Sequence, residues 1–316
     1  KSNSSLFDFF IKNFKKSKKN FKMNIYICTL ISKKNLKFLR SFLKSLDEIK
    51  LPGNLKFKMI FIINPKIRYS KFLIKRYLNR LDYFILESIK DNIPYSRNVF
   101  LKFIRKKNYE YAGFLDDDCI VDNNWLVNMI NFIKQNNCDI VGGPQKHKIK
   151  DITYQNYYDV LEPNREHGKL VKWVATNNCF FSKKILMEST IFFDTEFSKY
   201  GGSDQLFFYK FYKKKFILKW NLKSFIIENY NSDREKKIWF LKRNLRYGYS
   251  GNLIDKKIYG KMSLIIIFMK IFYLLTGALF FKTIPSSKSQ IRASFFLFRA
   301  FGRFKGLFNY RPEKYI

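Results

Sequence analysis

The chain has 316 residues, of which 47% are hydrophobic and 19% aromatic, so it can bury a sizeable core and is not mainly disordered. It carries 61 lysines and arginines against 25 acidic residues, a formal net charge of +36, and its 13 glycines and 7 prolines exclude a collagen-like or linker-dominated chain. This positive charge is compatible with an anionic membrane, with nucleic acid or with a plain compositional bias toward lysine, and it does not choose among them.

Short apolar runs alternate with helix-like segments from residue 24 onward, which predicts a mostly parallel sheet covered by helices on both faces. Strands are expected at 24–30, 57–63, 82–88, 111–115 and 138–143. Helices are expected at about 32–46, 68–80, 94–107 and 123–136. The polar segment 144–172 is expected to be a loop on the substrate side, followed by a strand and helix start over 172–186 and by helices over 203–214 and 233–250.

The C-terminal part changes character. Residues 263–281 are apolar and interrupted only by Lys270, and residues 291–308 alternate aromatic with basic side chains. We expect membrane association, and the pattern leaves open a spanning helix, a hairpin in the membrane plane or a core helix. The expected organisation is a basic arm over 1–22, a catalytic domain over 23–252 and membrane-associated helices over 253–316.

The four cysteines show no paired C-x-x-C spacing, and the first twenty residues show no secretory signal. This pattern favours a reduced compartment and argues against a zinc site or a disulfide framework. The expected location is the cytoplasmic face of the cell membrane, with peripheral or single-span attachment.

Acidic residues are rare here, yet Asp116, Asp117 and Asp118 directly follow the apolar run 111–115. Because ligands bind beyond the carboxyl ends of strands in such sheets, this triplet predicts a site for Mg²⁺ or Mn²⁺ with phosphate oxygens. A solvated acidic turn is the alternative. A second candidate is Asp204, which follows Gly201 and Gly202 at a predicted helix start and is suited to act as a general base; Ser203 is expected to cap that helix.

Five segments occur in the order found in family 2 glycosyltransferases: 26–46, 93–118, 176–186, 193–211 and 234–248. Over residues 23–252 the chain resembles that family, whose members have the GT-A fold, a Rossmann-like α/β architecture with a mostly parallel sheet, use nucleotide sugars and invert the anomeric centre. The chain departs from the pattern at Asn64-Pro65, where the family often has an Asp that reads the base, at Leu30, where Pro is usual, and at Ser203, where Glu is usual.

The resemblance implies a role for each matching residue. Asp204 is the general base, and Asp116 and Asp118 form the Asp-x-Asp pair, the first near the ribose and the second on the metal. The remaining donor-binding candidates are Arg97, Asp117, Arg243 and Arg246. The substrate-contact candidates are Asn177, Asn178, Gly201 and Gly202. His147 and His167 are weaker candidates for a third metal ligand or an acceptor contact.

These observations predict an inverting, metal-dependent glycosyltransferase of the hexosyltransferase type, active in polysaccharide biosynthesis. It would move a sugar from a nucleotide-diphosphate donor to a hydroxyl of a glycan or lipid-linked acceptor, with no nucleic-acid partner. The alternatives are a basic nucleic-acid-binding protein and a glycosyltransferase-like scaffold without catalysis.

Overall fold

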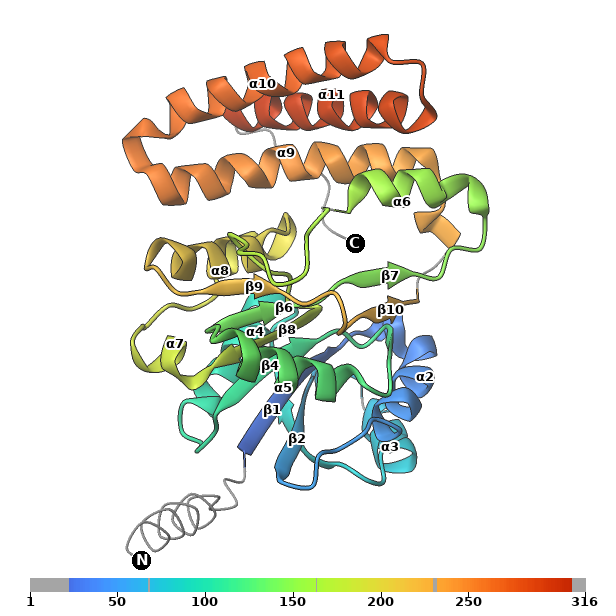
Figure 1. Cartoon of the computed structure of the whole chain (residues 1–316), viewed down its shortest axis with the longest axis vertical. Helices are drawn as coiled ribbons and strands as arrows, with labels where there is room; N and C mark the ends of the chain where they lie inside the picture. The colour runs from blue at the N-terminus through green and yellow to red at the C-terminus, as the bar shows by residue number, and fades with distance from the viewer. Residues whose placement is uncertain (1–22, 68, 163, 230–231, 309–316) are drawn as a thin grey trace, which may run out of the picture.

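The computed structural model describes residues 23–67, 69–162, 164–229 and 232–308, so the basic arm expected at residues 1–22 lies outside it. A central sheet with helices on both faces forms the larger part, and three long helices form a separate layer at one end (Figure 1). This α/β architecture with a C-terminal helical layer confirms the predicted fold class.

Seven strands form the main sheet in the order β3-β2-β1-β4-β8-β6-β9. Their bounds are β1 Met23–Ile31, β2 Leu55–Ile63, β3 Asp82–Glu87, β4 Tyr111–Leu115, β6 Ile140–Gly142, β8 Asn178–Ser182 and β9 Leu218–Trp220. All neighbours pair in parallel except β8, which is antiparallel to both β4 and β6. The carboxyl ends of the six parallel strands therefore lie at one edge, and β8 begins at that same edge.

The helices cover both faces of this sheet because β-strand side chains alternate between them. One core cluster joins β1 and β2 to α2 (Leu36–Asp47), α3 (Tyr69–Tyr77) and α5 (Trp125–Asn136). The other joins the opposite face to α4 (Ile93–Ile104), α7 (Lys183–Met187) and α8 (Ser203–Lys213). Short 3-10 turns complete the domain at Lys33–Asn35, Ile152–Tyr154, Thr195–Lys199, Ser232–Arg234 and Gly260–Met262.

Segment 144–172 is more ordered than the loop that the sequence predicts. It contains β7 (Gln145–His147) and α6 (Gln155–Leu161), and β7 joins β5 (Cys119–Val121) and β10 (Ile226–Glu228) in a second sheet of order β5-β10-β7. α6 packs its tyrosines against Phe240 and Phe295 of the C-terminal helices. A seven-residue helix whose apolar partners lie far along the chain leaves no clear periodic signal.

The C-terminal layer consists of α9 (Lys237–Tyr259), α10 (Ser263–Thr283) and α11 (Ser287–Leu307) (Figure 1). α9 and α11 cross where Gly248 meets Gly302: a Cβ on Gly302 would lie 1.9 Å from the Leu245 carbonyl oxygen, so only glycine permits this approach. α9 also continues without a break across the domain boundary expected at 252–253, and that division stays a prediction.

Polar side chains of this layer point inward. The buried Asp255 of α9 binds Lys270 of α10 at 2.7 Å and Arg303 of α11 at 2.8 Å. Arg303 also donates to Asn252, and Arg299 donates to Asn244 at 2.6 Å. The single cation of the apolar run and two of the α11 arginines are therefore held between the helices.

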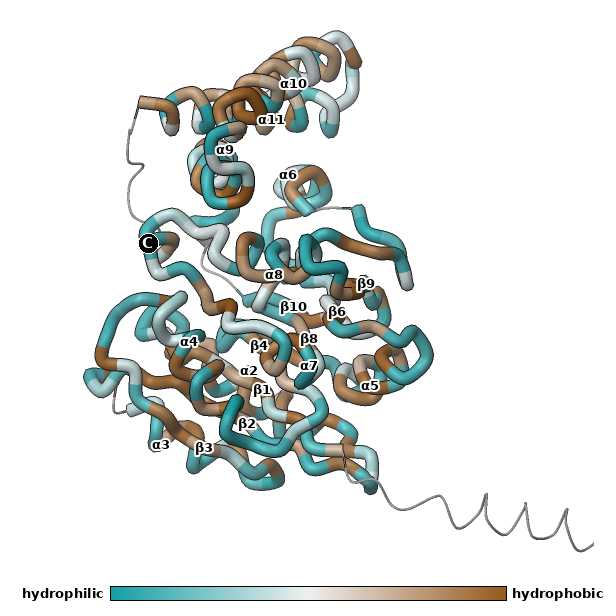
Figure 2. The backbone as a smooth tube through the Cα atoms, turned by 90° about the vertical axis from the view of Figure 1, so that its left-hand side faces the viewer, coloured by the Kyte–Doolittle hydropathy of each residue, from teal (hydrophilic) through white to brown (hydrophobic). Residues whose placement is uncertain are grey.

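Apolar side chains of the same layer point outward. On α10 the exposed set is Leu264, Ile265, Phe268, Met269, Phe272, Tyr273, Leu275, Leu279 and Phe280. On α11 Phe301 and Phe304 are each 50% exposed. Apolar residues recur along both helices, at the end of the molecule farthest from α2 and α3 (Figure 2). Among the described residues, one continuous helical stretch, Lys237–Thr283, has the length and apolar composition to cross a membrane.

Candidate active site

The acidic triplet begins directly after β4, at the carboxyl edge of the sheet. Asp117 accepts hydrogen bonds from the Ser32 backbone N–H at 2.7 Å and from the Asn35 side chain at 2.6 Å. Asn35 also donates to Asp118 Oδ2 at 3.2 Å. One amide at the start of the first helical segment thus fixes two of the three carboxylates, a role that the sequence did not reveal.

The triplet concentrates negative charge in a desolvated place. Burial raises the pKa of Asp116 to about 6, with a further contribution from the negative charges of Glu228 and Asp204. The positive charge of Arg97 acts in the opposite direction. Burial raises the pKa of Asp117 to about 7, and burial with the charge of Glu228 raises the pKa of Asp118 well above its usual range. These carboxylates are therefore short of positive charge, the condition in which a divalent cation binds well.

A second charged cluster lies beside the triplet on the small sheet. Glu228, at the end of β10, binds Arg234 at 2.6 Å and lies 3.1 Å from His147 Nδ1, whose Nε2 lies 3.2 Å from Glu162. Burial by itself would raise the pKa of Glu228, but the hydrogen bond from His147 and the charge of Arg234 lower it to about 2. The Asn229 N–H donates to the Asp118 carbonyl at 2.7 Å, which places this cluster next to Asp118.

Asp204 lies in the first turn of α8, behind a turn made by Gly201 and Gly202 with φ of +73° and +89°. Gly202 is the N-cap residue and Ser203 the first helical residue, so the predicted capping by Ser203 is wrong. Its hydroxyl instead accepts a hydrogen bond from Arg97 Nη1 at 3.2 Å.

Arg97 connects the two acidic positions. It reaches from α4 to Ser203, the residue before Asp204. The charge of Arg97 lowers the pKa of Asp116, whereas the charge of Asp204 raises it. The start of α8 and the end of β4 are thus connected through Arg97, and a shared site for the metal-binding and general-base candidates stays a prediction.

Comparisons with known proteins agree with this arrangement. The family model described as "Glycosyl transferase family 2" matches residues 25–192, more than half of the chain. The chain belongs to glycosyltransferase family 2. No protein of curated function matches the sequence.

Solved structures show the fold of this glycosyltransferase. A mannosyltransferase from Pyrobaculum calidifontis, in complex with GDP-Man and Mn²⁺, superposes with a TM-score of 0.63 at 12% identity, over 95% of this chain and 94% of that one. S. aureus TarS 1–349, solved with UDP and with UDP-GlcNAc, gives a TM-score of 0.52 at 12% identity, over 91% and 92% of the two chains. These likenesses establish the GT-A fold, and the family makes the protein a nucleotide-sugar glycosyltransferase.

The two arginines of α9 have different neighbours in the glycosyltransferase site. A Cβ on Gly201 would lie 3.9 Å from Arg246 Nε, so this guanidinium lies over the glycine turn. Arg243 donates to the Tyr247 hydroxyl at 2.6 Å and lies over the Trp239 ring. The charge of Arg243 also helps to lower the pKa of Glu228, after those of His147 and Arg234.

The two asparagines before β8 differ in surroundings. The Asn177 carbonyl accepts the Asp116 N–H at 3.3 Å, and its side chain bonds to Gln145, so Asn177 borders the acidic triplet. Asn178 is 1% exposed, and its amide holds Trp125, Pro144 and Ser224 together. The Asn178 side chain therefore has a structural role, and a sugar contact stays a prediction for both asparagines.

The two histidines separate in the structure. His147 is held between Glu162 and Glu228, as described above, whereas His167 accepts the Leu222 N–H at 3.2 Å and packs against Phe132. No group of three or more histidine, cysteine, aspartate or glutamate side chains in the described segments is arranged to hold a metal. The four cysteines are free and buried.

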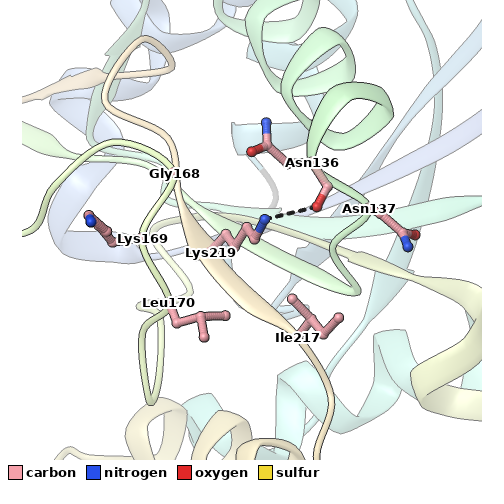
Figure 3. Close-up of a pocket in the computed structure, with 7 residues that line it drawn as sticks. All are labelled: Asn136, Asn137, Gly168, Lys169, Leu170, Ile217 and Lys219. Atoms are coloured by element: carbon pink, nitrogen blue, oxygen red, sulfur yellow. Dashed lines mark hydrogen bonds between the residues drawn. The ribbon is translucent and has the colours of Figure 1, made fainter.

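A shallow depression lies elsewhere, lined by Asn136, Asn137, Gly168, Lys169, Leu170, Ile217 and Lys219 (Figure 3). Lys219 donates to the Asn136 carbonyl across it at 3.0 Å. Asn137 precedes β6 and Ile217 precedes β9, so the depression lies at the amino ends of these strands. It is at the edge of the sheet opposite to Asp116 and is not part of the site.

Replacing Gly202 by Ala is expected to reduce both stability and activity. Its φ of +89° is costly for any residue with a Cβ, about 1–3 kcal/mol, and the new Cβ would lie 3.2 Å from Ile254 of α9. The strain is relieved only by moving the turn that carries Asp204. Thermal unfolding and donor turnover measure the two effects. Gly260→Ala is the matched control, because its φ is also positive at +52° but nothing lies within 4 Å; equal activity losses in both variants would contradict this expectation.

Proposed function

We propose that this glycosyltransferase is a metal-dependent, inverting enzyme of the hexosyltransferase type that acts in polysaccharide biosynthesis at the cytoplasmic face of the cell membrane. Its donor is a nucleotide-diphosphate sugar, and its acceptor is a hydroxyl of a glycan or lipid-linked precursor. The observation that carries the proposal is the position of Arg97, which binds Ser203 beside Asp204 and whose charge, like that of Asp204, acts on Asp116. Residues 23–252 carry out catalysis and residues 253–316 provide the membrane contact.

Asp204 is the general base in this proposal. It accepts the proton of the acceptor hydroxyl while that oxygen bonds to the anomeric carbon and the bond to the leaving nucleoside diphosphate breaks on the opposite face. Within the described part of the chain, the Asp204 carboxylate accepts one hydrogen bond, from the Gln205 N–H to Oδ1 at 2.9 Å, which leaves Oδ2 for the acceptor. Gly201 and Gly202 let the backbone approach the sugar closely.

The donor side is formed by the triplet and the arginines. Asp116 and Asp118 supply two carboxylates, and Mg²⁺ or Mn²⁺ commonly takes one or two carboxylates together with substrate phosphates. The raised pKa values of both carboxylates fit this pairing, because buried carboxylates short of cations gain most from one. When bound, the metal neutralises charge on the leaving diphosphate. Arg97, Arg243 and Arg246 add positive charge around the phosphates, while Asp117 positions the loop through Ser32 and Asn35.

The solved relatives support the donor class. The Pyrobaculum enzyme was crystallised with GDP-Man and Mn²⁺, and TarS with UDP-GlcNAc. The base of the nucleotide is not fixed here by an Asp after β2, where Asn64 and Pro65 stand instead.

Asp118→Ala is expected to abolish metal-dependent nucleotide binding. The test is calorimetry with UDP, GDP and dTDP, with Mn²⁺ or EDTA, alongside release of nucleoside diphosphate from the corresponding sugars. Removing the metal with EDTA should reproduce the effect of the substitution in the unmodified protein. Asp122→Ala is the control, because Asp122 lies just beyond β5 and, among the described residues, its side chain accepts only the Asn124 N–H, at 2.9 Å. Metal-independent binding of every nucleotide, or none at all, would refute the metal-dependent enzyme and favour the non-catalytic scaffold.

The helical layer supports the membrane part of the proposal. Arg299, Arg303 and Lys270 bind Asn244 and Asp255 between the helices, while many large apolar side chains of α10, together with Phe301 and Phe304 of α11, face outward. A water-soluble helical unit has the opposite distribution. Because α11 returns antiparallel to α10 and carries outward apolar side chains of its own, we favour a hairpin lying in one leaflet over a single span (Figure 1).

Phe301→Ser combined with Phe304→Ser is expected to weaken binding to vesicles. Each phenylalanine is 50% exposed, and burying such a side chain in lipid contributes about 1.5–3 kcal/mol. Flotation with phosphatidylglycerol-containing vesicles measures the loss. Phe72→Ser is the control, because Phe72 is 52% exposed on α3, in the catalytic domain. If the double variant and the control float like the unmodified chain, the apolar layer does not enter the bilayer.

A further inference from the structure

Arg165 occupies an unusual position between α6 and β8. Its guanidinium carbon lies 4.6 Å from the centre of the Trp173 ring and 4.4 Å from that of Trp220. Within the described segments it makes no hydrogen bond and no ion pair. Both indole rings therefore cover the guanidinium while its N–H groups remain available.

The stack is held rigidly by the edge of the sheet. Trp220 ends β9 and is 8% exposed. The segment that follows Arg165 is hydrogen-bonded to β9. The Gly168 N–H donates to the Trp220 carbonyl at 2.8 Å, and the Val171 N–H donates to the Leu218 carbonyl at 2.9 Å. A planar guanidinium held against aromatic rings loses little freedom when an oxyanion binds its edge, which is the geometry that suits carboxylate and phosphate.

The position of Arg165 relative to the acids points to the acceptor side. Burial lowers the pKa of Arg165 to about 10, and the charges of Glu162 and Asp204 oppose this effect. It therefore stays positively charged at neutral pH, close enough to Asp204 to feel its charge. The cations that act on Asp116, by contrast, are Arg97 and Arg234. Arg165 therefore interacts with the charge of the proposed base, Asp204, and not with those of Asp116 and Asp118, which favours the acceptor side over the diphosphate side.

We propose that Arg165, stacked on Trp173 and Trp220, binds an anionic group, phosphate or carboxylate, carried by the acceptor. This proposal rests on the proposed function in one respect: the bound molecule is called the acceptor because Asp204 is taken to be the general base. The binding itself requires no catalysis. It predicts that neutral glycans are poorer acceptors than glycans that carry a negative charge near the reacting hydroxyl.

Equilibrium titration tests the site without donor or metal. Inorganic phosphate, glucose 1-phosphate, glucuronate and uncharged glucose are added to the full chain in EDTA, and the change in tryptophan fluorescence, to which Trp173 and Trp220 contribute, reports binding. We expect saturable quenching by the three anions and none by glucose. Arg165→Gln should weaken anion binding at least about tenfold, and Arg165→Lys, which keeps the charge without the planar fork, should lie between them.

Two further variants separate the sources of the signal. Arg76→Gln should leave anion binding unchanged. It removes another arginine that lies over two aromatic rings, 5.8 Å from the centre of the Phe72 ring and 5.6 Å from that of the Tyr77 ring on α3. Arg97→Gln tests the donor side: loss of anion binding in this variant, with full binding in Arg165→Gln, would place the anion there and overturn the proposal.

The proposal would also be overturned if Arg165→Gln bound the anions as tightly as the unmodified chain does. A merely structural Arg165 would lower the melting temperature in Arg165→Gln without changing anion affinity, so thermal unfolding is measured alongside. Failure of Asp118→Ala to affect nucleotide binding concerns the proposed function alone, because the anion titration contains neither metal nor donor.

Discussion

Asp204→Asn is expected to lower kcat by about 10²–10⁴-fold, because the variant keeps the size of the side chain but removes its capacity to accept the acceptor proton. Metal-dependent nucleotide binding should remain, since Asp204 lies at the start of α8 and the carboxylates proposed to bind the metal follow the end of β4. Initial rates of nucleoside diphosphate release with acceptor present, together with calorimetry on the same preparation, measure both quantities.

Asp82→Asn is the matched control for this measurement. Asp82 begins β3, at the far edge of the main sheet, and its side chain is 75% exposed with only a 3.4 Å ion pair to Lys58. Its rate should equal that of the unmodified enzyme. A fully active Asp204→Asn would assign proton transfer to another group, and parallel loss of nucleotide binding would show that Asp204 acts on the donor instead.

Asp255→Ala is expected to destabilise the helical layer by about 3–5 kcal/mol, because it leaves Lys270 and the buried Arg303 without their shared carboxylate. Urea unfolding in detergent, followed by Trp239 fluorescence at the start of α9, reports the free energy of unfolding of this part. The partners come from α10 and α11, so all three helices should loosen together.

Asp159→Ala provides the comparison. Asp159 on α6 also pairs with a cation of α11, Lys288 at 2.6 Å, but both side chains are partly exposed, and such pairs contribute about 0–1 kcal/mol. Equal free-energy losses in the two variants would show that the buried carboxylate has no special role in holding the layer together.

Much of this architecture follows from local pattern. The run 111–115 is predicted as a strand, and β4 has those bounds, which places the acidic triplet at the carboxyl edge of the sheet. The helix predicted over 203–214 is likewise found as α8, with Asp204 in its first turn. These features could be predicted because strands and helices of this length carry their own hydrophobic period.

Other features depend on partners distant in sequence. β10 has three residues, which is too short for a periodic pattern to predict that Glu228 ends a strand beside Asp118. The short apolar run before Glu228 is the local signal for this strand. The pairing of Arg303 with Asp255 spans 48 positions, and from composition alone the α11 arginines suggest a lipid-facing basic surface. In the structure Arg299 and Arg303 face α9 instead. Such contacts arise from tertiary packing, which periodicity does not encode.

The contact between Gly202 and α9 has a geometric consequence for substrate choice. The turn before Asp204 packs against Ser250 and Ile254 on one side of α9, and the same helix is joined to α11 at Gly248 and Gly302. Under the proposed function, the reacting hydroxyl would therefore lie at a constant height above the helical layer. With that layer seated in a leaflet, acceptors whose hydroxyl lies a few sugar units from their lipid would fit this height. Longer chains would have to fold back to reach it, so the enzyme would select acceptors by their length as well as by their chemistry.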